Sequence, residues 1–255
     1  MTRERITSRS NPLVARLKKL NGKRSARREA GLFVCEGPKL LQEALKWGAD
    51  LDTVLCAEGV PLPELPAGVR VVEMPPELLA CVADTEAPQG IVFLCRGSIR
   101  PLPEQVSGSR YLVLDGVQDP GNVGTIWRTA DAFGADGLIL CGCADPWNPK
   151  TVRATMGAVF RLPVYEQPLE SAAERLAAAG IPLYATALRE DTEDVRDVDL
   201  SRGAVMIGSE GRGISELGLS LCQKTLKIPM TERCESLNAG VAAAVVLWEM
   251  ARRAM

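Results

Sequence analysis

The feature that most constrains the fold is an alternation of strand-like and helix-like segments from Tyr111 to the end of the 255-residue chain. Such alternation predicts a mostly parallel β-sheet with helices on both faces. Ligands bind to open sheets of this kind at the carboxyl ends of the strands. The expected strands are residues 111–114, 138–141, 182–187, 204–207 and 225–228, and the expected helices are 123–133, 150–160, 169–179, 216–221 and 236–253.

The preceding part of the chain predicts a smaller α/β domain. Its expected helices are 11–20, 38–47 and 76–83, and its expected strands are 53–56, 69–73 and 91–95. The stretch that follows, RGSIRPLPEQVSGSR, is rich in Gly, Pro and Ser and predicts a linker. We therefore expect domains at residues 1–98 and 110–255, joined by a linker at 99–109.

Positive charge is concentrated at the start of the chain. Residues 1–30 contain ten Lys or Arg and two Glu, a net charge of +8, which leaves −10 for the remainder of a chain whose total is −2. A basic segment of this kind is suited to contact with phosphates. A compatible alternative is an amphipathic helix whose leucines face a core. The candidates for phosphate contact are Arg9, Arg16, Lys18, Lys19, Lys23 and Arg24.

The chain contains no histidine, which excludes the Ser-His-Asp and Cys-His hydrolases and the histidine-ligated metal enzymes. Any general base must be a carboxylate, Lys, Arg, Cys or Tyr. The eight cysteines form no C-x-x-C pair, and most of them lie in apolar, strand-like contexts. We therefore expect reduced thiols that act as small apolar side chains, and neither a disulfide framework nor a metal site.

No apolar run approaches the length of a membrane span, and the N-terminus lacks the apolar stretch of a secretory signal. The basic, Ser-containing start leaves an organellar transit peptide as an alternative. It passes directly into strand and helix patterns, however, so we expect a cytoplasmic protein without a membrane partner.

Two polar side chains follow the first expected strand of the larger domain, in LVLDGVQDPGNVGTIWRTADAFG. Asp119-Pro120-Gly121 is a turn sequence, and Asn122 is suited to cap the helix that follows. Arg128 lies six residues further along. The two side chains could be only a helix cap and a solvated residue, but their place at the expected ligand-binding edge also makes them candidates for a site.

Two later segments reach the same edge. AVMIGSEGRGIS ends an apolar strand in a glycine-rich loop with Glu210 and Arg212, and repeated glycine allows close backbone approach to a ligand. KIPMTERCESLNAGVAAAVV carries Ser236, suited to cap the last helix, and Asn238. The small residues of that helix predict close packing against a backbone or a partner subunit. The missing Walker lysine and G-x-G-x-x-G fingerprint disfavour an ATPase, a GTPase or a nucleotide-dependent oxidoreductase.

Together the three segments resemble the SpoU (TrmH) family of the SPOUT methyltransferases. The first motif is matched by NVGTIWR with FG at 133–134, the second by IGSEGRG at 207–213, and the third by IPM at 228–230 with SLN at 236–238. The resemblance covers residues 110–255 and includes VRATMGAVFRLPV between the first two motifs. Residues 1–95 are similar, less specifically, to the small RNA-binding domain that many of these enzymes carry.

The resemblance implies transfer of a methyl group from S-adenosyl-L-methionine to a ribose 2′-hydroxyl of RNA, without a metal. It implies that Arg128 acts at the target ribose and its phosphate, either by positioning them or as the proton acceptor, which requires a strongly perturbed guanidinium. Asn122, Glu210, Ser236 and Asn238 would complete the catalytic group. The implied cofactor-binding residues are Thr186, Leu188, Gly208, Ile228, Met230 and Leu237.

The resemblance also implies a deep trefoil knot in the C-terminal domain, an exception to the general rarity of knots, and a homodimer formed through that domain. Ribosomal RNA is the expected substrate, with transfer RNA as the alternative, and the six basic candidates at the N-terminus would contact the RNA. A non-catalytic RNA-binding protein that keeps the fold is the remaining alternative. Retention of all five polar residues favours the enzyme, because a binding module does not need them together.

Overall fold

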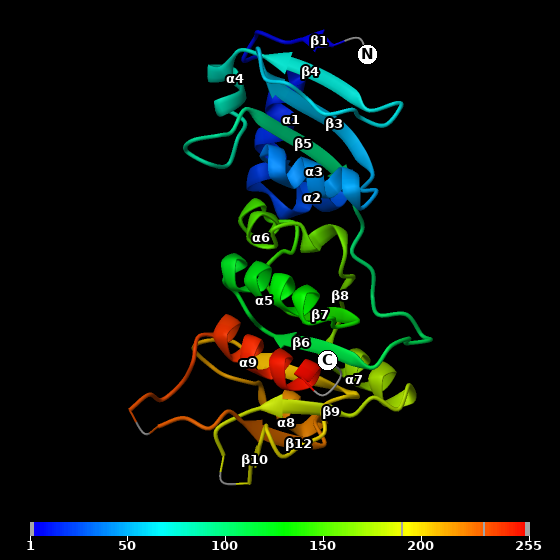
Figure 1. Cartoon of the computed structure of the whole chain (residues 1–255), viewed down its shortest axis with the longest axis vertical. Helices are drawn as coiled ribbons and strands as arrows, with labels where there is room; N and C mark the ends of the chain where they lie inside the picture. Colours follow the sequence, from blue (N-terminus) through cyan, green and yellow to red (C-terminus); the bar gives the residue numbers. More distant parts are fainter. Residues whose placement is uncertain (1–2, 190, 232, 253–255) are drawn as a thin grey trace. The chain divides into compact units, whose positions relative to one another are not determined.

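The computed structural model of the chain describes residues 3–189, 191–231 and 233–252, which form two compact units (Figure 1). The first unit is the part up to Ser98 together with Asp145–Phe160, and the second is Ile99–Ala144 together with the part from Arg161 on. By packing, therefore, a segment from the middle of the chain belongs with the N-terminal part. The division predicted from the sequence, an RNA-binding domain at residues 1–98, a linker at 99–109 and a methyltransferase domain at 110–255, stays a prediction.

The first unit contains a five-stranded mixed sheet. Its strands are β1 (Glu4–Arg5), β2 (Leu32–Glu36), β3 (Leu51–Ala57), β4 (Arg70–Met74) and β5 (Ile91–Arg96), and its helices are α1 (Pro12–Gly22), α2 (Arg24–Ala30), α3 (Pro38–Lys46), α4 (Pro76–Ala80), α6 (Pro149–Ala154) and the 3-10 turn η1 (Ala158–Phe160). The strand order is β1-β4-β3-β5-β2. β4 pairs in parallel with β1 and β3, whereas β5 is antiparallel to β3 and β2.

All six elements predicted for residues 11–95 are present, with small shifts of their ends. The sequence predicts neither β1, α2 nor β2. Four consecutive residues of β2 are buried, so this strand lacks the alternation of apolar and polar residues that marks a half-buried strand.

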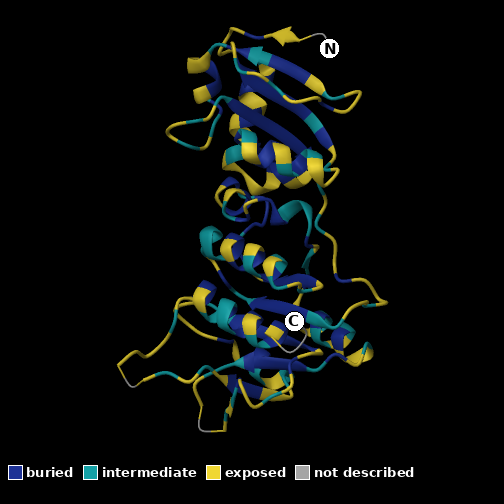
Figure 2. Cartoon of the chain, in the orientation of Figure 1, coloured by how far each residue is buried: buried dark blue, intermediate teal, exposed yellow. Residues whose placement is uncertain are grey.

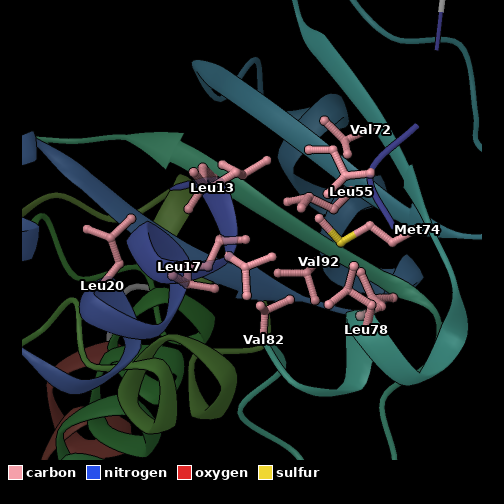
Figure 3. Packing of buried hydrophobic residues seen from close by; sticks show 14 of the residues in the cluster. Leu13, Leu17, Leu20, Leu55, Val72, Met74, Leu78, Val82 and Val92 are labelled. Atoms are coloured by element: carbon pink, nitrogen blue, oxygen red, sulfur yellow. The ribbon is translucent and has the colours of Figure 1, made fainter. Parts of the chain in front are cut away.

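Helices α1 and α4 contribute to the core on one face of this sheet. The buried cluster combines Leu13, Leu17 and Leu20 of α1 with side chains from β2, β3, β4, β5 and α4. Figure 3 shows these leucines and strand side chains, among them Leu55 and Val92, gathered in one packed layer. Asn11 caps α1, because its side chain accepts a hydrogen bond from the backbone N–H of Leu13 at 2.9 Å.

A buried ion pair and an aromatic stack are among the contacts that hold the segment Asp145–Phe160 to the rest of the first unit. Arg27 donates to Asp145 Oδ2 from Nη2 at 2.6 Å and from Nε at 2.8 Å, and their side chains are 3% and 6% exposed. The Phe33 and Trp147 rings stack at a centroid distance of 4.3 Å. These contacts join residues more than a hundred positions apart, and local sequence patterns cannot predict them.

The single helix predicted over residues 150–160 is wrong, because the structure has α6 followed by η1. Met156 has φ = 49° and Gly157 has φ = 94°, and left-handed backbone conformations end a right-handed helix. Met156 is the one residue other than glycine with a positive φ within the described ranges.

The second unit contains a seven-stranded sheet in the order β10-β12-β9-β11-β6-β7-β8, in which each pairing of neighbours is parallel. The predicted parallel sheet is thus confirmed, and the two strands that the sequence does not predict, β8 and β10, are short edge strands. The strands are β6 (Arg110–Asp115), β7 (Gly137–Cys141), β8 (Val164–Glu166), β9 (Leu183–Thr186), β10 (Glu193–Asp194), β11 (Gly203–Gly208) and β12 (Lys224–Lys227), and the helices are α5 (Pro120–Ala132), α7 (Leu169–Ala178), α8 (Glu216–Leu221) and α9 (Ala239–Arg252).

Helices cover both faces of this sheet, as predicted. Tyr111 and Val113 of β6 belong to a buried cluster with Leu176 of α7. Leu112 and Leu114 alternate with them and therefore point to the opposite face, where α5 and α9 contact each other, α5 contacts β7, and α9 contacts β11. Figure 2 shows the strands as mostly buried, with exposed residues on the outer sides of the helices and on loops. The trefoil knot stays a prediction.

Five of the eight cysteines are buried, which agrees with the prediction that most act as small apolar side chains. Burial raises the pKa of Cys141 to about 12 and that of Cys143 to about 11, so both thiols remain protonated at neutral pH. Across the described stretches of the chain, no helix has the length and apolar character required to span a membrane.

The buried ion pair gives a stability prediction. Asp145→Ala should lower the free energy of unfolding by about 3–5 kcal/mol, because it leaves the Arg27 charge buried without its partner. Glu58→Ala, which removes the partner of the exposed Arg5, is the control and should cost less than about 1 kcal/mol. Chemical unfolding monitored by circular dichroism measures both, and equal losses would contradict the role of the buried pair.

Candidate active site

Helix α5 begins at Pro120, and its N-cap is Asp119. The Asp119 carboxylate accepts a hydrogen bond from the backbone N–H of Asn122 at 2.8 Å, so the prediction that Asn122 caps this helix is wrong. Proline is tolerated at the first position of a helix because a backbone N–H there would have no hydrogen-bond acceptor within the helix. With the capping position taken by Asp119, the Asn122 side chain is available for contacts outside its helix.

Helix α9 begins at Ala239, so the predicted start at Ser236 is also wrong, and the predicted end at Arg253 lies outside the described residues. Asn238 Oδ1 accepts hydrogen bonds from the backbone N–H groups of Gly240 at 2.9 Å and Val241 at 3.3 Å. The Asn238 side chain therefore supplies an acceptor for backbone N–H groups of the first turn of α9 that have no partner within the helix. Ser236 lies in the loop before α9.

One chain of hydrogen bonds joins the three sequence motifs. Asn238 Nδ2 donates to Asn122 Oδ1 at 3.3 Å, and Asn122 Nδ2 donates to Glu210 Oε1. Each residue follows a different strand, since Asn122 lies after β6, Glu210 after β11 and Asn238 after β12. The parallel sheet thus brings three loops, distant in sequence, to one edge.

A cavity of about 300 Å³ opens at the same edge, at the carboxyl ends of β9, β11 and β12. All six residues that the resemblance assigns to cofactor binding line it, together with two of the predicted catalytic residues. These are Thr186, Leu188, Gly208, Ile228, Met230 and Leu237, with Glu210 and Ser236. The Thr186 hydroxyl donates to the carbonyl of Met206 at 3.0 Å, so it also ties β9 to β11.

The lining of the cavity fits a nucleoside that carries charged groups, such as S-adenosyl-L-methionine. Apolar side chains, among them Ile228 and Leu237, form much of the wall, and Glu210 and Ser236 supply a carboxylate and a hydroxyl. Gly208 allows the loop after β11 to fold back on itself, because a Cβ atom there would lie 2.1 Å from the carbonyl carbon of Gly213. The backbone of this loop can therefore form one wall of the cavity.

Arg128 lies apart from the other four predicted catalytic residues. Its side chain is exposed on α5, and six residues at 100° each place it about 120° around the helix from Asn122. Within the described part of the chain it neither lines the cavity nor joins the hydrogen-bond chain of Asn122, Glu210 and Asn238. The structure thus brings four of the five predicted residues together and leaves the guanidinium at the surface.

The six basic residues predicted to contact RNA are all exposed in the first unit. Helix α1 buries Leu13, Val14, Leu17 and Leu20, which confirms the amphipathic helix. Arg9, Arg16, Lys18, Lys19, Lys23 and Arg24 lie on or beside α1 and at the start of α2 with exposed side chains, and their contact with RNA stays a prediction.

Asp115 and Asp119 are positioning residues that sequence reasoning does not identify. Asp115, the last residue of β6, accepts a hydrogen bond from the backbone N–H of Ser215 at 2.7 Å. Ser215 in turn caps α8 through the N–H of Gly218. An acidic residue directly after a strand at the ligand-binding edge is the signal that could have identified Asp115. No group of three or more His, Cys, Asp or Glu side chains among the described residues could hold a metal ion.

The fold and the cavity together indicate the class of protein. It is an α/β protein that binds a small ligand, of the size of a nucleoside, at the carboxyl ends of its parallel strands. Residues 109–248 match the model of the SpoU rRNA Methylase family, and residues 11–92 match that of the MRM3-like substrate binding domain. The chain belongs to the SpoU rRNA Methylase family, which confirms the resemblance.

Two relatives and one solved structure match nearly the whole chain. The 23S rRNA (guanosine(2553)-2′-O)-methyltransferase RlmP of Bacillus subtilis is 34% identical, over 97% of this chain and 99% of its own. The 23S rRNA (uridine(2479)-2′-O)-methyltransferase of Streptomyces viridochromogenes is 34% identical, over 98% and 92%. The crystal structure of an AdoMet-bound rRNA methyltransferase from Sinorhizobium meliloti superposes with a TM-score of 0.88 at 32% identity, over 99% and 98%.

The folded-back loop gives a prediction about two glycines. Gly208→Ala should lower the free energy of unfolding by about 1–3 kcal/mol, because the added methyl group meets backbone atoms of Gly213 that cannot move away cheaply. Gly211→Ala in the same loop has open space around its Cβ and should change stability by less than about 0.5 kcal/mol. Thermal and chemical unfolding compare the two, and equal stability would contradict the close packing.

Proposed function

We propose that this protein is an S-adenosyl-L-methionine-dependent methyltransferase that methylates a ribose 2′-hydroxyl of ribosomal RNA. The observation that carries the proposal is the hydrogen-bond chain from Asn238 through Asn122 to Glu210 beside the cavity at the strand ends. Membership of the SpoU rRNA Methylase family and the names of the two relatives support it. The AdoMet bound in the Sinorhizobium meliloti structure supports the choice of cofactor.

The proposed mechanism rests on positioning. The cofactor, when bound, supplies an electrophilic methyl group, and in-line attack by a ribose hydroxyl requires the two reactants to be held in close alignment. Two hydrogen bonds, from Asn238 to Asn122 and from Asn122 to Glu210, hold the loops after β6, β11 and β12 together. The cavity beside these loops therefore keeps its shape. Arg128 stands exposed, where RNA can reach it, and binds the target ribose and its phosphate.

The activity is tested with unmodified ribosomal RNA and methyl-labelled S-adenosyl-L-methionine, followed by digestion to nucleosides. Label should appear in a 2′-O-methylnucleoside. Arg128→Ala should lower kcat/KM at least about 10²-fold, because a charge-assisted contact to the reacting ribose is lost, while cofactor affinity measured by calorimetry stays unchanged. Arg175→Ala, on α7 at the other face of the sheet, is the matched control.

Three outcomes of this assay discriminate between the hypotheses. Absence of label in every 2′-O-methylnucleoside, with ribosomal and transfer RNA alike, favours a non-catalytic RNA-binding protein. Label in transfer RNA alone favours the alternative substrate. Loss of both turnover and cofactor binding in Arg128→Ala contradicts the role of Arg128 at the RNA.

The proposal includes a homodimer formed through the second unit and activity in the cytoplasm, where its RNA substrate is expected. Two large apolar side chains of α9 are half exposed, Val241 at 51% and Trp248 at 50%. The Trp248 ring contacts Phe133, at the end of α5, edge to face at 5.9 Å. Apolar surface of this kind is suited to be covered by a second copy of the chain.

The dimer is tested by charge substitution on α9. Trp248→Glu should shift the protein from dimer to monomer in sedimentation velocity, because a carboxylate in an apolar interface loses its hydration. Trp47→Glu is the matched control, since Trp47 is also 50% exposed but lies in the first unit. A wild-type monomer, or the same shift in both variants, would contradict this interface.

A further inference from the structure

We propose that a pocket in the first unit binds one unpaired nucleotide of the RNA substrate, with its base inserted into the pocket. The inference rests on the proposed function, because it takes the ligand to be the RNA that is methylated. The pocket has a volume of about 620 Å³ and is bounded by the end of β2, the start of α3, the loop before β5 and the segment after α6. It is separate from the cavity at the strand ends, which lies in the second unit.

The rim of the pocket is tied together by hydrogen bonds between three segments. The Glu36 carboxylate accepts from the backbone N–H groups of Asp84 at 3.0 Å and Thr85 at 3.3 Å, and from the Thr85 hydroxyl. Arg153 Nη1 donates to Asp84 Oδ2 at 2.6 Å. The end of β2, the loop at residues 84–89 and α6 therefore hold one another in place, so the pocket is formed before a ligand arrives.

Met156 presents an apolar surface to this pocket at a conformational cost. Its φ of 49° is one that side chains other than glycine rarely adopt, and its side chain is 52% exposed. Neither core packing nor backbone preference accounts for a thioether held in this position. A flat base against Met156 would cover it, with the buried Leu40 at the inner wall.

The polar groups of the pocket suit the edge of a base better than a phosphate. Gln42 and Gln89 each offer an amide that both donates and accepts, and Gln89 lies close to Gly37, where a Cβ would be 3.2 Å from its Oε1. The charged side chains of the lining are Glu36, Glu43, Lys39 and Arg153, two acidic and two basic, and Arg153 is paired with Asp84. The lining therefore has no excess of positive charge to attract a phosphate. Sequence-specific proteins read unpaired RNA bases by stacking and by hydrogen bonds to base edges.

The location of the pocket points to RNA as the occupant. Three of its four walls come from residues 36–43 and 85–89, which lie within the match to the substrate binding domain at residues 11–92. The exposed basic residues of α1 are predicted to contact phosphates, and such contacts carry no sequence information. A pocket on the same unit with no net charge and two glutamine amides supplies the sequence-reading contact that the basic residues cannot provide.

The test uses the double variant Met156→Gly, Gln89→Ala in the full-length protein. Glycine adopts the φ of residue 156 without strain, so the substitution removes the side chain and keeps the backbone. The control carries Leu217→Ala and Gln105→Ala, which truncate an exposed apolar residue and an exposed glutamine in the second unit. Affinity for unmodified 23S ribosomal RNA transcribed in vitro is measured without cofactor across a range of salt concentrations.

The double variant should bind this RNA roughly tenfold more weakly, as expected for one lost base contact, and the control should bind like wild type. The slope of log affinity against log salt should stay unchanged, because no phosphate contact is removed. In dimethyl sulfate probing, one unpaired base that the wild type protects should become reactive again. Calorimetry with S-adenosyl-L-methionine should give wild-type affinity, which shows that the second unit is folded, and circular dichroism should give the wild-type thermal transition, which shows that the first unit is folded as well.

An RNA affinity within twofold of wild type, or a loss accompanied by a flatter salt slope, overturns the proposal. If the wild-type protein methylates RNA while the double variant binds it normally, only the pocket proposal fails. If the wild-type protein binds no ribosomal RNA, the proposed function and the pocket proposal fail together.

Discussion

The parallel pairing of β6 with β11 is the constraint on which the site depends. The two strands pair in register to their last residues, where Asp115 is opposite Gly208. The loops that follow therefore start level with each other at one edge of the sheet. This registry is what allows Asn122, seven residues after one strand, to hydrogen-bond Glu210, two residues after the other. A shift of the pairing by two residues would move the loop ends by about 7 Å and separate them.

The capping residues extend this arrangement to the helices. Asp119 caps α5 and so frees the Asn122 amide, whereas Asn238 both satisfies the first turn of α9 and donates to Asn122. One asparagine thus fixes a helix end and joins two loops. The absence of a side chain at Gly240 lets the start of α9 lie close to the Asn238 side chain and to α5, because a Cβ there would lie 3.1 Å from Asn238 Oδ1 and 3.6 Å from Thr125. Part of the small-residue character of α9 is therefore explained within the chain.

Strand and helix patterns in the sequence predict the parallel sheet and most of its elements, because those patterns reflect local burial. Helix starts are less predictable, since Asn122 and Ser236 are good caps by residue type but Asp119 and Asn238 take the positions. The place of the segment Asp145–Phe160 depends on partners distant in sequence. Four of the predicted cofactor residues, Gly208, Ile228, Met230 and Leu237, lie in family motifs that follow strands of the parallel sheet. Thr186 and Leu188 lie outside those motifs, at the end of β9.

Charge counted along the sequence overstates the cationic surface available to RNA. Arg27 contributes to the net charge of the first thirty residues, yet it is buried against Asp145. Arg3 and Arg5 pair with Glu73 and Glu58. The positive charge that can displace counterions from RNA is therefore smaller than the net +8 of residues 1–30. It is centred on α1, whose leucines face the core and whose basic side chains face solvent. The amphipathic helix determines which of these charges remain at the surface, because burial of its leucines fixes its orientation on the sheet.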